Sequence, residues 1–144
     1  MVRAAYTAAM DTDTLAGRVR DALLEESSPP PCAWLFGSLA RGTGHAHSDI
    51  DVAVLLGHVP PATLSGAGLS LGGRLEERLG REVDLIVLDR APVDLVHRVL
   101  RDGTLLYDHD PSARVRFEVR ARNEYFDLLP YLREYRRFSP DRAP

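Results

Sequence analysis

Apolar and polar residues follow one another along the chain in a pattern that predicts short buried strands between amphipathic helices. The run CAWLF, bounded by turn residues, is typical of a buried strand. After Ser48, the apolar residues Ile50, Val52 and Val54 recur at every second position, as in a strand with one buried face. The predicted strands are Cys32–Phe36, 49–56, 81–89 and a short extended segment over 104–107.

Apolar residues at helical spacing fill the intervals between these strands. Leu15, Val19 and Leu23 lie four residues apart, and a stripe through Val115 and Val119 begins the long C-terminal segment. The predicted helices are 12–26, 62–80, 92–102 and one that opens at Asp110 or Ser112, in which Pro130 is expected to cause a kink or an interruption. Helices alternating with strands predict an α/β or α+β fold in a single domain.

The length of 144 residues fits one compact domain. We expect a flexible N-terminus over 1–11, the folded domain over 12–138 and a flexible tail over 139–144. No apolar run approaches the roughly 20 residues of a membrane helix, and the first residues lack the apolar core of a signal peptide. Cys32 is the single cysteine, which excludes an intramolecular disulfide and favours a reducing cytoplasm.

Charge narrows the chemistry further. All 18 basic residues are arginine, and the net charge is −3. The absence of lysine excludes a Schiff-base enzyme and a Walker-type phosphate loop, because both need that side chain. A negative net charge gives no bulk attraction to nucleic acid, so a nucleic-acid substrate is not expected. The arginines of the final helix leave two interpretations open, a solvated basic face or a partner surface.

Candidate chemistry is concentrated where the first strand ends and the second begins. Gly37 lets the backbone approach a ligand closely, and Ser38 opens a turn whose N–H groups suit a phosphate. Asp49 and Asp51 stand two residues apart on a strand, so both carboxylates point to one face. Such a pair repels unless a cation lies between its members, and oxygen ligands suit Mg²⁺.

A third carboxylate is available in the run REVDLIVLD. Asp84 is flanked there by apolar residues, and an unpaired charge in a buried strand is costly unless it faces a metal. Asp89 ends the same run on the opposite face, beside a turn, so Asp84 is the preferred candidate. Three carboxylates around two metal ions are typical of in-line phosphoryl or nucleotidyl transfer, and Asp84 would also lie where a general base is needed.

These residues carry a family resemblance. The stretch GSLARGTGHAHSDIDVAVLL contains G-S-x10-D-x-D, with a lone aspartate in a later strand, and resembles the DNA polymerase beta-like nucleotidyltransferase superfamily. The small size is similar to that of its minimal nucleotidyltransferases (MNT). The segments VDLIVLDRAPVDLVHRVLRDGTLLYDHD and NEYFDLLPYLREYRR look like the antitoxin branch, which is paired with HEPN-family ribonuclease toxins. The resemblance covers roughly residues 30–138 and implies a small twisted mixed sheet with helices packed against it.

The resemblance also implies a site and a reaction. The family's nucleotide-binding positions match Gly37, Ser38, Arg41 and Ser48, and its catalytic and metal-binding positions match Asp49, Asp51 and Asp84. It implies two Mg²⁺ ions as cofactors and ATP as substrate. It further implies transfer of AMP to a tyrosine hydroxyl of the cognate HEPN toxin, in a type VII-like toxin–antitoxin system. For Arg41, a clamp on phosphate and a pair with a surface carboxylate both remain open.

Two other functions stay open from the sequence. One is the same chemistry on a small molecule, as in aminoglycoside nucleotidyltransferases, for which this chain has little room to hold the acceptor. The other is a binding module that neutralises its partner by steric block. Replacing Asp49 and Asp51 by asparagine would separate catalysis from steric block, because a purely steric antitoxin would still protect the cell.

Overall fold

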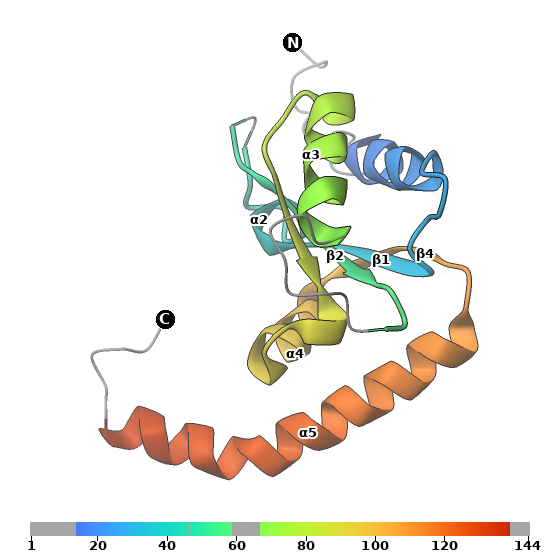
Figure 1. Ribbon diagram of the computed structural model, residues 1–144. Helices are drawn as coiled ribbons and strands as arrows, with labels where there is room; N and C mark the ends of the chain where they lie inside the picture. Colours follow the sequence, from blue (N-terminus) through green and yellow to red (C-terminus); the bar gives the residue numbers. More distant parts are fainter. Residues whose placement is uncertain (1–13, 46, 59–66, 139–144) are drawn as a thin grey trace.

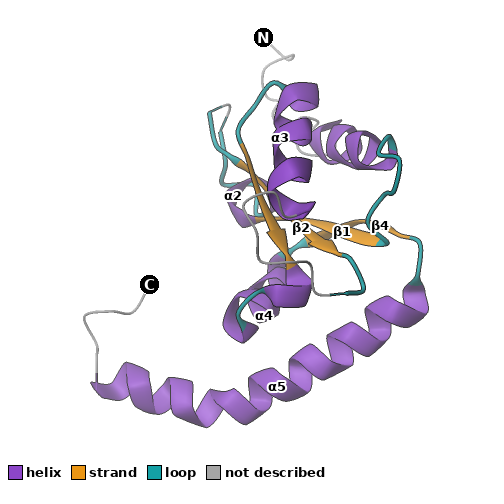
Figure 2. Ribbon diagram, in the orientation of Figure 1, coloured by secondary structure: helices purple, strands orange, loops and turns teal. Residues whose placement is uncertain are grey.

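The computed structural model describes residues 14–45, 47–58 and 67–138, and the expectations for 1–11 and 139–144 lie outside this range (Figure 1). A helix over residues 14–24 comes first. The elements that follow are β1 (Cys32–Phe36), α2 (Gly37–Ala40), β2 (Ile50–Leu55), α3 (Ala67–Leu79), β3 (Val83–Val87), a 3₁₀ turn (Leu88–Arg90), α4 (Val93–Asp102), β4 (Thr104–Asp108) and α5 (Pro111–Phe138). Figure 2 shows these helices and strands along the chain.

The four strands form one mixed sheet in the order β3-β2-β1-β4. β1 pairs antiparallel with both β2 and β4, whereas β2 and β3 run parallel. A parallel pair needs a crossover connection, and here the chain passes through α3 between β2 and β3. The expected mixed sheet with packed helices in one domain is therefore confirmed.

Side chains of the central strands alternate between two apolar cores, one on each face of the sheet. The helix over 14–24 and α3 cover one face, and α4 and α5 cover the other (Figure 1). In β1, Ala33 and Leu35 belong to the first core, whereas Cys32 and Trp34 belong to the second. The same alternation continues in β2. Ala53 and Leu55 face α4 and α5, and so does every second residue of the strand counted from them.

The turn expected at Gly37 and Ser38 opens the short helix α2 directly after β1. Two details differ from the sequence-based expectations. The third strand ends at Val87, because the chain enters a 3₁₀ turn there. Of the two effects expected of Pro130, the interruption is not found: α5 runs from Pro111 to Phe138 through this residue, and the helix is curved in Figure 1. Pro130 is exposed, so water can solvate the carbonyl group that proline leaves without a donor.

α5 is attached to the domain mainly through its first half. Phe117 and Ala121 are its buried residues, and Arg114 forms ion pairs with Asp108 at the end of β4 and with Glu118 one turn later. The second half extends beyond α4 (Figure 1). Several of its large apolar side chains are exposed, among them Tyr131 at 70% and Phe138 at 74%.

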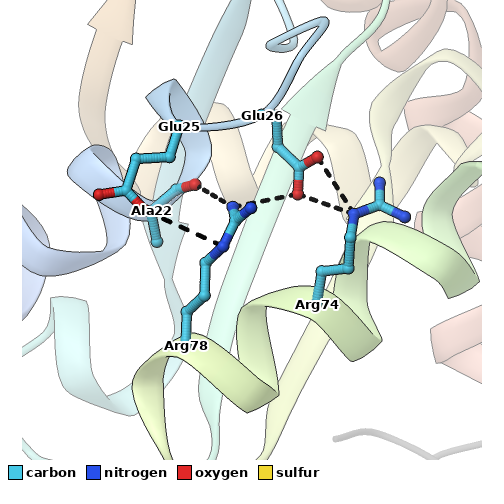
Figure 3. A network of polar contacts seen from close by, with 5 residues as sticks. All are labelled: Ala22, Glu25, Glu26, Arg74 and Arg78. Carbon is cyan, nitrogen blue, oxygen red and sulfur yellow. Dashed lines mark hydrogen bonds and ion pairs between the residues drawn. The ribbon is translucent and has the colours of Figure 1, made fainter.

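On the opposite face, arginines of α3 hold the helix over 14–24. Arg78 donates to the carbonyl oxygen of Ala22 at 2.7 Å and to the carboxylate of Glu26 at 3.2 Å, and Arg74 donates to the same carboxylate at 2.9 Å (Figure 3). Glu25 lies 4.0 Å from Arg78. This network fixes the position of α3, which in turn covers β3.

No helix in the described part of the chain is long and apolar enough to cross a membrane.

The chain before β1 is fixed by a buried hydrogen bond. The hydroxyl of Tyr107 in β4 donates to the carbonyl oxygen of Pro30 at 2.6 Å. Replacing Tyr107 by phenylalanine leaves that carbonyl oxygen without its donor and is expected to lower the free energy of unfolding by about 1–2 kcal/mol. Urea denaturation measures the change. Tyr131→Phe, at an exposed position, is the matched control, and an equal effect in both variants would contradict the prediction.

Candidate active site

The site is built around a glycine that the fold requires. Gly37 begins α2 directly after β1 and has a φ of 74°, in the left-handed region that favours glycine. A Cβ atom on this residue would lie 2.0 Å from Oδ2 of Asp51. The carboxylate of Asp51 is therefore packed against the bare backbone of Gly37, and any side chain there would displace it.

The turn after Gly37 is closed by one carbonyl group. The carbonyl oxygen of Ser38 accepts hydrogen bonds from the N–H groups of Thr43 at 2.9 Å and Gly44 at 3.0 Å. The Thr43 hydroxyl donates to the same oxygen at 3.3 Å. Backbone N–H groups in the first turn of a helix have no partner inside that helix, so this turn presents donors beside Asp51. These N–H groups can donate hydrogen bonds to a phosphate oxygen.

The strand register brings two of the predicted carboxylates together. Asp51 in β2 is paired with Asp84 in β3 across the parallel ladder, and with Phe36 in β1 on its other side. Both aspartates lie on the sheet face that carries α4 and α5. Asp51 is half-buried, and burial followed by the charges of Asp84 and Asp49 raises the pKa of its carboxyl group, which Arg41 partly offsets.

Asp84 is exposed on an edge strand, so the expectation that it occupies a buried position is wrong. The sequence shows the apolar neighbours of Asp84. It does not show that β3 pairs with one strand, β2, and leaves its other edge open. The argument that burial would make Asp84 costly without a metal therefore does not hold. Its pairing with Asp51 is what connects Asp84 to the other carboxylates.

A second acidic pair, Asp49 and Glu82, lies two residues before Asp51 and Asp84, where β2 and β3 begin. A hydrogen bond with the Asp49 carboxyl group, together with its negative charge, raises the pKa of Glu82. The backbone N–H of Ile50 donates to the carbonyl oxygen of Glu82 at 2.9 Å, which extends the ladder to this level. Sequence reasoning missed Glu82. The signal is present, because Glu82 and Asp84 repeat the two-residue spacing of the acids that open β2.

The donor chemistry of these acids fits Mg²⁺, but their side chains are not arranged as a complete ligand set. Within residues 14–45, 47–58 and 67–138, no three His, Cys, Asp or Glu side chains are placed so as to hold a metal ion. Asp49 lies beside Glu82, whereas Asp51 is paired with Asp84. Burial, followed by the negative charges of Asp84 and Asp49, raises the pKa of Asp51, and a divalent cation would offset the repulsion between these charges.

Asp89, the other candidate in this strand, has a structural contact. Its carboxylate accepts the N–H groups of Leu56 at 2.7 Å and Gly57 at 2.9 Å. It therefore terminates β2 at the end opposite to Asp51. The preference for Asp84 over Asp89 agrees with this geometry.

The remaining predicted residues surround the carboxylates in different ways. Arg41 ends α2 and is exposed, and its charge acts on both Asp51 and Asp102. Ser48 shapes the loop before Asp49: its hydroxyl accepts the N–H of His45 at 2.9 Å, and its own N–H donates to the carbonyl oxygen of His45 at 3.0 Å. The structure thus places Arg41 near the acids and gives Ser48 a role in the loop.

A small mixed sheet that presents carboxylates from two adjacent strands beside a glycine turn is the architecture of a nucleotidyltransferase. A family model described as "Polymerase beta, Nucleotidyltransferase" matches residues 21–112, and the chain belongs to this family. Among individual proteins, it is similar to protein adenylyltransferase MntA of Shewanella oneidensis, with 39% identity over 75 residues. That match covers 51% of this chain and 51% of MntA, so it spans about half the length of the curated relative.

Solved structures support the same fold. One, described as a toxin–antitoxin with AMP-PNP, is 27% identical with a TM-score of 0.67, and the match covers 88% of this chain and 95% of that chain. Another is described as a tri-AMPylated Shewanella oneidensis HEPN toxin in complex with MNT antitoxin. It is 23% identical with a TM-score of 0.57, covers 93% of this chain and 96% of that chain, and shows likeness of fold.

Proposed function

We propose that this chain is a Mg²⁺-dependent protein adenylyltransferase and the antitoxin of a HEPN toxin. It would transfer AMP from ATP to a tyrosine hydroxyl of that toxin, using a nucleotidyltransferase domain over 12–138. The observation that carries the proposal is the cross-strand pair Asp51–Asp84, held beside Gly37 at the start of α2. The similarity to MntA and to the toxin–antitoxin with AMP-PNP supports ATP as donor and a toxin protein as acceptor. The fold is shared with an MNT antitoxin in complex with a tri-AMPylated HEPN toxin, which agrees with a HEPN acceptor.

The proposed reaction is an in-line displacement at the α-phosphorus of ATP. The toxin hydroxyl oxygen forms the new bond to phosphorus, the bond to the β-phosphate oxygen breaks, and pyrophosphate leaves with that electron pair. The turn at Gly37 and Ser38 binds phosphate oxygens, and Arg41 adds a positive charge at the rim. Asp84, exposed at the sheet edge, is the carboxylate that an incoming hydroxyl can reach, and it accepts the proton.

Asp49, Asp51 and Asp84 are the residues that would hold Mg²⁺, as two ions. Bound metal would supply positive charge to the phosphates and acidify the attacking hydroxyl. Asp51 is the most enclosed of the three and fixes the arrangement, because its carboxylate is packed against the backbone of Gly37. Asp49, which lies beside Glu82, would contribute its carboxylate from the start of β2.

We place this reaction in the cytoplasm. Cys32 is the single cysteine and is buried, where its thiol donates to Asp108 at 3.2 Å, and burial raises its pKa to about 12. A protonated, buried thiol in a protein without disulfide partners fits a reducing compartment.

Mass spectrometry of the cognate HEPN toxin tests the proposal. Incubation with this protein, ATP and Mg²⁺ is expected to raise the toxin mass by one or more AMP units, with the modification on tyrosine. The Asp49→Asn/Asp51→Asn variant and a reaction with EDTA should give no gain. Unmodified toxin after incubation with the wild-type protein would contradict adenylylation.

Steric neutralisation is the second candidate, and one observation favours it. The second half of α5 carries large exposed apolar side chains, among them Phe126, Tyr131, Tyr135 and Phe138, which offer a surface for a partner protein. Under this alternative, the toxin ribonuclease would be inhibited in the absence of ATP and equally by the Asp49→Asn/Asp51→Asn variant. Inhibition that requires ATP and intact aspartates contradicts it.

A further inference from the structure

The loop that leads into Asp49 is held from outside by a residue of the neighbouring strand. Nη2 of Arg81 donates to the carbonyl oxygen of Ser48 at 2.6 Å and to that of His45 at 3.3 Å. Arg81 lies two residues before β3, the strand that carries Asp84. The guanidinium group of Arg81 therefore connects the segments that precede β2 and β3, the two strands that carry the acidic residues.

We infer that Arg81 is a positioning residue that fixes Asp49 for metal binding and thereby sets the Mg²⁺ requirement of the enzyme. The inference rests on the proposed function and adds to it a residue that acts through the backbone before Asp49.

The geometry of the loop shows why such a contact is needed. His45 and Ser48 are joined by two hydrogen bonds, of 2.9 and 3.0 Å, which close a turn directly before Asp49. Both carbonyl oxygens that Arg81 contacts belong to this turn. Residue Ser48 is bonded to Asp49 through the peptide group, so movement of the Ser48 carbonyl rotates the backbone that carries the Asp49 side chain.

Charge repulsion would otherwise separate the two strands at this point. Asp49 lies beside Glu82 and Asp51 beside Asp84, so like charges face each other on successive levels of the ladder. Arg81 does not neutralise them: it makes no ion pair among the described residues and binds carbonyl oxygens instead. It therefore holds the backbone in place while leaving the carboxylates free for a cation.

Arg81→Met is the test variant, because methionine keeps an apolar stem and removes every donor. We expect the Mg²⁺ concentration for half-maximal AMP transfer to rise roughly 10-fold. Changes of this size are typical of residues that orient a metal ligand without binding the metal themselves. The rate at saturating Mg²⁺ should change much less. Arg81→Lys is expected to restore a requirement near that of the wild type, because an ammonium group can donate to the same two carbonyl oxygens.

Arg78→Met is the matched control. Arg78 also donates to a backbone carbonyl at 2.7 Å, but on the face away from the acids (Figure 3). This variant should lower stability and leave the Mg²⁺ requirement unchanged. An equal rise in both methionine variants would overturn the inference, because it would show that any loss of stability has this effect.

Amide hydrogen exchange at Ser48 and Asp49 gives a second readout that needs neither toxin nor ATP. Exchange should accelerate in Arg81→Met and not in Arg78→Met; unchanged exchange in Arg81→Met overturns the inference. If the wild-type protein transfers no AMP, the proposed function fails, and exchange alone then decides whether Arg81 holds the loop.

Discussion

Replacing Asp51 by asparagine is expected to lower the rate of AMP transfer at least about 1,000-fold, which corresponds to roughly 4 kcal/mol of transition-state stabilisation. The carboxylate is packed against Gly37 and paired with Asp84, so no other anionic group can take its place. An amide keeps the shape but removes the charge that a divalent cation requires. Single-turnover transfer to the toxin measures the effect.

The same substitution should leave the fold intact or make it more stable. Because burial and neighbouring acids raise the pKa of Asp51, its ionised form costs stability above that pKa, and a neutral side chain removes this cost. The free energy of unfolding at pH 7 is therefore expected to be equal or higher in Asp51→Asn. A large loss of stability would contradict this explanation of the site.

Asp89→Asn is the matched control for Asp51→Asn. Asp89 accepts two backbone N–H groups at the far end of β2, and an amide oxygen can serve one of them. We expect a decrease in stability of about 1–2 kcal/mol with little change in transfer rate. Asp84→Asn should instead follow Asp51→Asn in activity. A reversed order of Asp84 and Asp89 would contradict the assignment of the third carboxylate.

Replacing Gly37 by alanine is expected to reduce AMP transfer about 100-fold, as is typical when a reacting group is displaced by an ångström or so. The new Cβ would lie 2.0 Å from Oδ2 of Asp51, so the carboxylate must move. The φ of 74° adds about 1–2 kcal/mol of backbone strain, which lowers stability. Steady-state transfer and thermal denaturation measure the two effects.

Gly57→Ala separates strain from displacement. Gly57 has a φ of 85°, but a Cβ there would meet nothing within 4 Å. This variant should lose similar stability and keep its activity. If Gly57→Ala lost activity as Gly37→Ala does, the contact with Asp51 would not be the cause.

The strands could be predicted from the sequence because their apolar runs and alternation are strong local signals. Cys32–Phe36 has the predicted bounds, and the second strand differs by one residue at each end. Local signals failed where the surroundings decide. Pro130 does not interrupt α5, because the helix is exposed there and solvent can replace the missing hydrogen bond.

The types of residue in the site could also be predicted, but not their distances. Spacing along one strand places Asp49 and Asp51 on one face, whereas pairing between strands, which the sequence does not show, joins Asp51 to Asp84. The contacts of Glu82 and Arg81 depend on the same pairing. The need for glycine at position 37 likewise comes from a side chain that arrives from β2.

The parallel pairing of β2 with β3 places Asp84 opposite Asp51, so the proposed active site depends on the register of these two strands. A slip of one residue would place Val83 or Leu85 opposite Asp51 and turn Asp84 toward α3. β3 is an edge strand, so such a rearrangement would leave the pairing of β1 with β4 untouched. The arrangement of the acidic residues therefore depends on the stability of the pairing between one edge strand and β2.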